Sequence, residues 1–320
     1  MSGTAFFCNM ARRRKNIKIR FSAKHLKVFA IFAGIALLVL GGTYVFQPPA
    51  TRGEIKRAIC AWAVHSSDIS LAECIQDVFS VWDSSAPKVD YVPVENEALG
   101  GFPVAERKLQ YLDNGCFFVG YDEELRLPAW VAYRLFDGKW HDAGKRPDAF
   151  LPDSRLASPV KSEDYTGSGY DRGHLAPNSA IAHCYGSDAQ LKTFVLSNVV
   201  PQKHGFNAGI WKQLERRELR NYALRYGEVW IVAGPVFGRK IRRTSTGLPI
   251  PEKLFKIIAC MRGGKVYALA FLMDQKADGR ISHYLSSIDE IEALTGLDFM
   301  PKLTPEQQKV IEANAARKAW

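Results

Sequence analysis

The longest uncharged stretch of the chain lies close to its start and predicts a membrane-spanning helix. Residues 28–46 carry no charged side chain, and residues 1–27 carry basic side chains and no acidic ones. A helix over 28–46, at about 1.5 Å per residue, is nearly as long as a bilayer's hydrocarbon core is thick, about 30 Å. Pro48 and Pro49 then end it. We expect a transmembrane signal anchor at 28–46 behind a basic cytoplasmic leader at 1–27.

A cleaved signal peptide is the alternative to an anchor. Its apolar region is usually shorter than 28–46, and no good small-x-small cleavage site follows Phe46. Both alternatives export the rest of the chain. We therefore expect a membrane-anchored, single-pass protein whose main domain is extracytoplasmic, in the periplasm, at the cell surface or in an intermembrane space.

Residues 54–79 have the spacing of a small helical hairpin. Ser70 and Glu73 have the Ser-x-x-Glu arrangement of a capping box, with apolar residues at helical spacing behind them. Cys60 and Cys74 lie one on each expected helix. They either form a disulfide in an oxidising compartment or remain two reduced core cysteines.

The pattern changes after the hairpin. Residues 83–101 contain prolines, serines and two adjacent glycines, which indicates a linker, so that 47–106 form a hairpin and linker. From residue 107 to 320 the chain has the density of one compact α+β domain. Strand-like runs lie at 116–121, 130–135, 228–234 and 266–272, and helical spacing at 212–226 and 288–294.

Composition and charge restrict the class of protein. The chain has 320 residues, 47% hydrophobic and 24% charged, with 6 cysteines, which excludes collagen, coiled-coil, disordered and small disulfide-scaffold proteins. The net charge of +10 is typical of nucleic-acid binding proteins. Most of that charge belongs to the basic leader, so the charge alone does not establish the function.

The candidate chemistry lies between residues 170 and 215. Three short motifs follow one another: Asp-Arg-Gly-His at 171–174, Ser-Asn-x-x-Pro-Gln at 197–202, and Asn-x-x-x-Trp-x-x-Leu-Glu at 207–215. An isolated Asp-Arg-Gly-His is most simply a surface turn with an ion pair, and the two later motifs change that interpretation. His174 is a natural general base, because the ordinary histidine pKa of about 6.5 lies close to neutral pH.

The three motifs in this order resemble those of the DNA/RNA non-specific endonucleases of the endonuclease G type, which are ββα-metal nucleases. The resemblance covers about residues 108–303 and includes Tyr-Thr-Gly-Ser-Gly-Tyr at 165–170 and Gly-Pro-Val-Phe at 234–237. It implies an α+β fold with a mostly antiparallel sheet flanked by helices. It also implies a metal-dependent, sugar-nonspecific endonuclease that hydrolyses phosphodiester bonds of DNA and RNA.

The resemblance assigns the main roles in the site. His174 would take a proton from the attacking water, and Asn207 would anchor Mg²⁺, with Mn²⁺ as the other candidate ion. A hard divalent ion prefers oxygen ligands and keeps several waters, so one Asn carbonyl can serve as its anchor. Arg172 would hold the scissile phosphate, because its planar guanidinium matches two phosphate oxygens.

The assignment of two further site residues, Arg146 and Glu215, leaves alternatives open. Arg146 is the best match to the family's upstream arginine, with Lys145 and Arg155 as rivals. In a continuous helix Glu215 would lie about 12 Å along and roughly 80° around from Asn207. Its carboxylate is therefore expected to reach water around the ion without coordinating it. The alternative is a surface glutamate paired with a neighbouring arginine.

The remaining polar residues of the motifs have supporting roles. Asn198 would support the site by hydrogen bonding, and the alternative is a turn or cap asparagine. Asp171 is expected to orient its loop. The other histidines, His204 among them, lack the spacing of a zinc site and are expected to be surface or packing residues.

DNA and RNA would be held through the phosphate backbone, because the family reads no sequence. Two basic clusters are candidates for this contact, one after Glu215 and one after Gly238, and binding through them would depend steeply on salt. Membrane contact would come from the N-terminal helix, and the resemblance also includes relatives that form homodimers. The basic residues are Arg216, Arg217, Arg220, Arg225, Arg239, Lys240, Arg242 and Arg243.

A non-catalytic nucleic-acid tether is the second hypothesis. A degenerate member of the fold, retained for binding, should have lost His174 or Asn207. This chain keeps both, and the nuclease is therefore the preferred interpretation. A phosphodiesterase for smaller substrates is a variant of the enzyme hypothesis.

Overall fold

The computed structural model describes residues 44–47, 49–64, 98–138, 141–262, 265–316 and 319–320, with short pieces between 71 and 95. The expected anchor at 28–46 lies almost entirely outside the described residues. Among the helices that are described, none has the length and apolar character needed to cross a bilayer.

The fold is built on an eight-stranded antiparallel sheet. Its order is β1-β14-β13-β10-β7-β6-β5, and β15 pairs with β14 at one side. The runs expected at 116–121, 130–135, 228–234 and 266–272 all lie in strands of this sheet, which confirms them. The strands are β1 (Lys88–Asp90), β5 (Gln110–Asp113), β6 (Phe117–Asp122), β7 (Leu127–Phe136), β10 (Glu228–Val236), β13 (Lys253–Arg262), β14 (Lys265–Asp274) and β15 (Leu285–Ser286).

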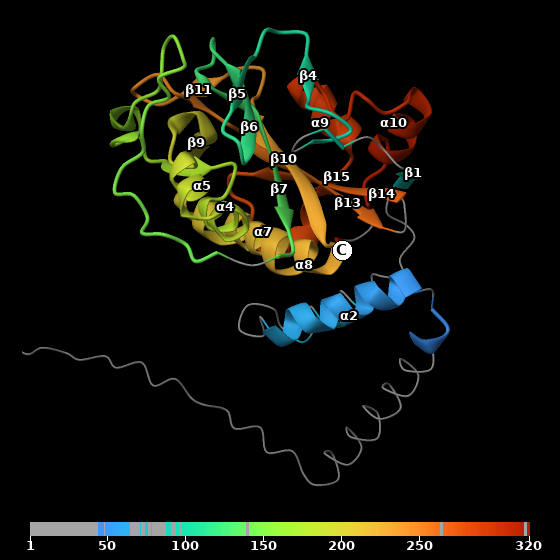
Figure 1. Ribbon diagram of the computed structural model, residues 1–320. Helices are drawn as coiled ribbons and strands as arrows, with labels where there is room; N and C mark the ends of the chain where they lie inside the picture. Colours follow the sequence, from blue (N-terminus) through green and yellow to red (C-terminus); the bar gives the residue numbers. More distant parts are fainter. Residues whose placement is uncertain are drawn as a thin grey trace, which may run out of the picture. The chain divides into compact units, whose positions relative to one another are not determined.

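Both faces of the sheet are buried, because alternate residues of its central strands belong to two different cores. On β7, Val131 and Tyr133 pack into one core, and Trp130 and Ala132 into the other. Helices cover the two faces separately (Figure 1). The first core lies under α4 (Asn178–Tyr185), α5 (Ser187–Lys192), α7 (Lys212–Arg217) and α8 (Leu224–Tyr226), and the second under α9 (Ile288–Thr295) and α10 (Pro305–Glu312).

The arrangement confirms the expected α+β class with an antiparallel sheet flanked by helices. The helices expected at 212–226 and 288–294 are present. The first is a series of short segments, in which α7 and α8 flank the π-helical η4 (Glu218–Ala223). The second is α9, capped by Ser287, whose side chain accepts a hydrogen bond from the Glu290 backbone.

A small ββα unit lies on the first face. It consists of β8 (Asp171–His174), β9 (Val199–Gln202) and the helical segments α6 (His204–Phe206) and η3 (Asn207–Trp211). β8 and β9 are antiparallel, and His174 lies opposite Val199. The glycine of the Asp-Arg-Gly-His motif is required here, because a Cβ on Gly173 would collide with the side chain of Gln202.

Short elements complete the fold. They are β2 (Val94–Glu95), β3 (Ala98–Leu99), β4 (Val104–Ala105), β11 (Arg242–Arg243), β12 (Pro249–Ile250), β16 (Leu297–Asp298), η1 (Ser162–Tyr165), η2 (Leu196–Asn198) and η5 (Ile281–Tyr284). The segment expected to be a linker, 83–101, includes β1 and β3. β1 belongs to the main sheet because Val89 is buried in the second core.

The first helix of the expected hairpin is α2 (Pro49–Val64), which is packed against the sheet domain. Glu54 and Arg262 form a buried ion pair at 2.9 Å, both side chains being only 8% exposed. The second helix lies mostly outside the described residues. Cys60 and Cys74 are not joined in the structure, which therefore does not have the disulfide considered between them.

The helical series that follows β9 is fixed to the sheet by a fully buried ion pair. Lys256 of β13 contacts Glu218 of η4 at 2.5 Å, and both side chains are inaccessible to solvent. The hydroxyl of Tyr133 donates to the other carboxylate oxygen of Glu218 at 2.7 Å. The Lys256 ammonium also lies 4.5 Å from the centre of the Trp211 ring. Each charged atom of the pair therefore has a compensating partner.

We expect Lys256→Met to lower the free energy of unfolding by about 3–5 kcal/mol, because it leaves Glu218 as a buried charge without its cation. Urea unfolding measures the change. Lys256→Met combined with Glu218→Gln should recover much of the loss. Arg134→Met removes a half-exposed ion pair with Glu228 and serves as the control, expected to cost about 1 kcal/mol or less. Equal losses for Lys256→Met and Arg134→Met would contradict the prediction.

Candidate active site

One polar cleft, of about 740 Å³, collects most of the residues that the motifs singled out. Five of the six expected site residues line it, and the sixth, Asn198, is fully buried beneath it. The five come from β8, η3, α7 and the loop before η1, segments that are separated in sequence. They are Arg146, Arg172, His174, Asn207 and Glu215.

His174 is held neutral at the floor of this cleft. It ends β8 and is 8% exposed, with the rings of Phe150 and Phe194 at 5.1 and 5.0 Å. Burial, together with the positive charge of Arg146, lowers the pKa of His174 to about 3. Its Nε2 atom has no hydrogen-bond partner among the described residues. A neutral imidazole that lines the cleft can accept a proton from a molecule there.

Asn207 is oriented by Asp171. The Asn207 side-chain amide donates to Asp171 Oδ2 at 2.9 Å, which leaves its carbonyl oxygen available as a ligand. Nδ1 of His204 lies 2.9 Å from the same carboxylate oxygen. Asp171 and His204 also line the cleft, so both belong to the site. His204 is exposed, as expected for a surface residue, and its contact with Asp171 places it beside the site. The role expected for Asp171 stays a prediction.

A signal for His204 was present in the sequence. It precedes Asn207 by three residues, a spacing that brings two side chains together on one face of a helix. The contact with Asp171 depends on the pairing of β8 with β9, which brings Asp171 opposite Gln202, close to the start of α6. That pairing could not be read from either motif alone.

Glu215 reaches the same cleft because the helix is not continuous. The segment η3 is a π turn with a kink at Gly209, and a π turn holds one extra residue. One residue corresponds to about 100° of helix rotation, which brings Glu215 back toward the face of Asn207. Burial and the nearby Glu218 raise the pKa of Glu215 to about 7, although Lys256 and Lys212 act in the opposite direction.

Arg172 is positioned by the loop before β8. Its Nη2 donates to the backbone carbonyl of Ser162 at 2.6 Å, and its guanidinium lies 5.6 Å from the centre of the Tyr165 ring. Its Nε is buried without a partner among the described residues. The orientation of Arg172 therefore depends on the position of η1, which contains both Ser162 and Tyr165.

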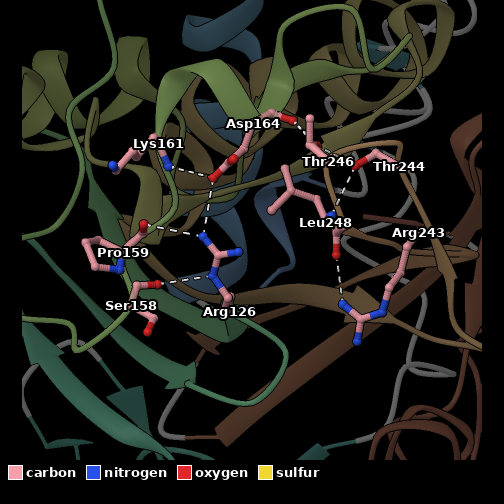
Figure 2. A network of polar contacts seen from close by, with 10 residues as sticks. Arg126, Ser158, Pro159, Lys161, Asp164, Arg243, Thr244, Thr246 and Leu248 are labelled. Carbon is pink, nitrogen blue, oxygen red and sulfur yellow. Dashed lines mark hydrogen bonds and ion pairs between the residues drawn. The ribbon is translucent and has the colours of Figure 1, made fainter.

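A polar network holds η1 in place (Figure 2). Arg126 contacts the Asp164 carboxylate at 3.3 Å and also donates to the carbonyls of Ser158 and Pro159. The same carboxylate accepts from the Lys161 backbone at 2.9 Å, and the hydroxyl of Thr246 donates to the Asp164 carbonyl. Sequence reasoning did not find Arg126, which acts on the site only through η1.

The structure separates Arg146 from its two rivals. Arg146 lines the cleft, and its guanidinium lies 5.3 Å from the centre of the Phe194 ring. Arg155 forms an ion pair with Asp153 at 2.6 Å and is not among the lining residues. Lys145 does not line the cleft either.

Only part of the two basic clusters expected to contact the phosphate backbone lies at the cleft. Arg216 and Arg220 line the cleft, together with Lys212. Arg225 is fully buried, and its backbone carbonyl accepts a hydrogen bond from Arg57 of α2, so its expected contact with phosphate was wrong. The cluster after Gly238 lies around β11, outside the cleft lining.

The model of the DNA/RNA non-specific endonuclease family matches residues 102–306. The chain belongs to this family. The mitochondrial nuclease EXOG of Mus musculus is 34% identical over 226 residues, 63% of this chain and 60% of the mouse protein. EXOG of Xenopus laevis is 30% identical over 73% of this chain and 70% of its own length. The chain spans 60% of the length of the mouse and human EXOG proteins that it matches.

A solved structure shows the same fold. The crystal structure of the EndoG/EndoGI complex superposes with a TM-score of 0.57 and 24% sequence identity, over 65% of this chain and 91% of the other. The family match and this fold agree with the resemblance carried by the three motifs.

The donor atoms of the cleft fit a hard divalent ion. The Asn207 carbonyl oxygen and the Glu215 carboxylate are oxygen donors, and both residues line the cleft. Mg²⁺ and Mn²⁺ prefer such oxygen donors. The fit depends on the Asp171–Asn207 hydrogen bond, because this bond uses the amide nitrogen of Asn207 and leaves its amide oxygen available as a ligand.

Asn198 holds the turn that follows His174. Its side-chain amide donates to the carbonyls of Ala176 and Thr193, both at 3.0 Å, and its side-chain oxygen accepts from the Ala176 backbone at 2.9 Å. All these groups are buried. Asn198 therefore positions the end of β8 and does not reach the cleft.

We expect Asn198→Ala to lower the free energy of unfolding by about 2–4 kcal/mol, because it leaves three buried backbone groups unpaired. Denaturant unfolding followed by circular dichroism measures this change. Asn114→Ala is the matched control, since it removes one exposed hydrogen bond from Arg155, and we expect a loss of about 1 kcal/mol or less. A loss as small for Asn198→Ala as for Asn114→Ala would show that the turn does not depend on these bonds.

Proposed function

We propose that the chain is a divalent-metal-dependent endonuclease that hydrolyses phosphodiester bonds of DNA and RNA in the cleft. The observation that carries this proposal is a neutral, buried His174 that lines a cleft shared with Asn207 and Arg172. A base, an oxygen anchor and a phosphate-binding guanidinium are the groups that such a reaction needs. His174 is the proposed general base and Asn207 the proposed metal anchor.

His174 removes a proton from water in this proposal. Its lowered pKa keeps the imidazole neutral near pH 7. A phosphate group in the cleft adds negative charge beside it and raises its basicity when substrate is bound. Arg146 stands close enough to affect the pKa of His174 and is also placed to meet that phosphate.

Arg172 and Arg146, which line the cleft with His174, would hold the scissile phosphate. Arg172 has its Nη2 fixed on Ser162, so the guanidinium is oriented before substrate binds. Asn207 would hold the divalent ion through its amide oxygen. When bound, this ion supplies Lewis-acid stabilisation of the phosphate and of the leaving oxygen. Glu215 lies in the same cleft and would accept hydrogen bonds from water there.

Substrate would be gripped through its phosphate backbone by the basic residues beside the cleft. Lys212, Arg216 and Arg220 lie along the helical series that also carries Asn207 and Glu215. Contacts of this kind carry no sequence information and weaken steeply with salt. The single-pass anchor at 28–46, the extracytoplasmic location and a homodimer are parts of the proposal that rest on the sequence alone.

We expect His174→Ala to lower kcat for plasmid and RNA cleavage by about 10²–10⁴-fold, because the proton acceptor is lost. DNA affinity should change little, since the phosphate contacts remain. Cleavage with Mg²⁺ and with excess chelator, alongside a filter-binding assay, measures both quantities.

His283→Ala is the control, because His283 is exposed on η5 and lies outside the cleft lining. It should keep the activity of the unsubstituted protein. Near-normal activity of His174→Ala would rule out its role as base. Binding without cleavage by the unsubstituted protein would favour the tether.

Binding of the divalent ion should strengthen as pH rises through about 7, because the Glu215 pKa lies there and the ion favours the ionised carboxylate. Near pH 7 we expect about half a proton to be released per ion bound. Calorimetric titration in buffers of different ionisation enthalpy measures this release. Glu215→Gln should abolish it, and Glu163→Gln, an exposed carboxylate outside the cleft lining, should not. Unchanged release in Glu215→Gln would assign the proton to another group.

A further inference from the structure

A second group of acidic side chains lies on the face of the sheet that does not carry the cleft. Asp289 and Glu292 are three residues apart on α9, and Glu312 is the last residue of α10. One carboxylate oxygen from each lies within 4.8 Å of the other two. The three groups therefore surround a space small enough for a single ion.

Glu312 is the member of the group that needs an explanation. It is only 4% exposed, and its Oε1 atom has no hydrogen-bond partner in the part of the chain that the structure describes. A buried carboxylate without a partner is costly unless a cation or a proton compensates it. Its side chain is aimed toward Asp289 and Glu292, so it lies among groups of its own charge.

The surrounding charges increase this cost. Burial, followed by the carboxylates of Glu292, Asp289 and Asp298, raises the pKa of Glu312 to about 8. Among the described residues, the charged groups that act on this pKa, Glu292, Asp289 and Asp298, are all acidic. The pKa of Glu292 is also raised, by burial and by Asp298 and Asp289, although its carboxylate accepts from the Phe299 backbone at 2.8 Å.

The two helices that carry the group are fixed by their own caps and contacts. Ser287 caps α9, and Thr304 and Gln307 form a capping box at the start of α10. Gln308 of α10 donates to Asp298 at 3.2 Å, close to the acidic group. The carboxylates are thus held together by the fold of the C-terminal part and do not converge by their own attraction.

We propose that Asp289, Glu292 and Glu312 bind a hard divalent cation, Ca²⁺ in particular, that ties the end of α10 to α9. The donors are all carboxylate oxygens, the ligands that Ca²⁺ prefers. Ca²⁺ also accepts irregular geometry and completes its shell with water, whereas Mg²⁺ demands a near-octahedral site. The site is separate from the nuclease cleft and does not depend on the proposed mechanism.

The test is the effect of Ca²⁺ on the thermal unfolding of the full chain, stripped with chelator and kept at a pH above 8, where Glu312 is ionised. We expect Ca²⁺ to raise the melting temperature by about 4 °C or more, because it binds the folded state only. Glu312→Gln and Asp289→Asn should each remove this shift, and calorimetry should find one Ca²⁺ fewer per chain. Asp289 is exposed, so its substitution should not endanger folding.

Two controls separate this site from other acidic groups and from the cleft. Glu306→Gln changes an exposed carboxylate on the same helix and should leave the Ca²⁺ shift intact. Asn207→Ala alters the nuclease cleft and should also leave it intact. The proposal is overturned if the shift disappears in Asn207→Ala or survives in Glu312→Gln. It is equally overturned if Ca²⁺ has no effect while Glu312→Gln stabilises the chain, because Glu312 is then compensated by a proton.

Discussion

The buried contact between Lys256 and Glu218 is the constraint on which the active site depends. It joins β13, in the middle of the sheet, to the helical series that carries Asn207 and Glu215. A buried ion pair is stable only when its remaining hydrogen-bonding capacity is used, and here Tyr133 and the Trp211 ring provide those contacts. The pair also fixes the position of the helical series along the sheet. A shift of these helices would separate two opposite charges in an interior without water.

The same charges reach the chemistry of the cleft. Lys256 lowers the pKa of Glu215 and Glu218 raises it, so the two charges oppose each other, and burial is the largest influence on this pKa. His174 shows the opposite case, in which burial and a neighbouring cation both favour the neutral form. The cleft therefore combines an uncharged base with a carboxylate that titrates near neutrality. These states depend on the packing around each side chain and not on its residue type.

The sequence predicted the strands and helices whose residues alternate or repeat clearly, among them β7, β10, β14 and α9. It missed β13 because Lys256 interrupts the apolar pattern at a position that proved fully buried. It predicted four residues of the cleft through linked motifs and Arg146 through the resemblance, but it treated Arg225 as a phosphate contact. A charged residue on a helix is usually exposed, and only the tertiary structure, with α2 packed against it, shows that Arg225 is buried.

The sequence by itself determined the family and the identity of the groups in the cleft, because these depend on residue types at fixed spacing within short segments. The tertiary structure decided which of those groups meet and in which ionisation state. Asp171 contacts Asn207 only because β8 pairs with β9, and Glu215 faces the cleft only because a π turn rotates the helix. Glu312 meets Asp289 only because α10 packs beside α9. Such contacts join distant segments, and their energies come from burial that no local pattern encodes.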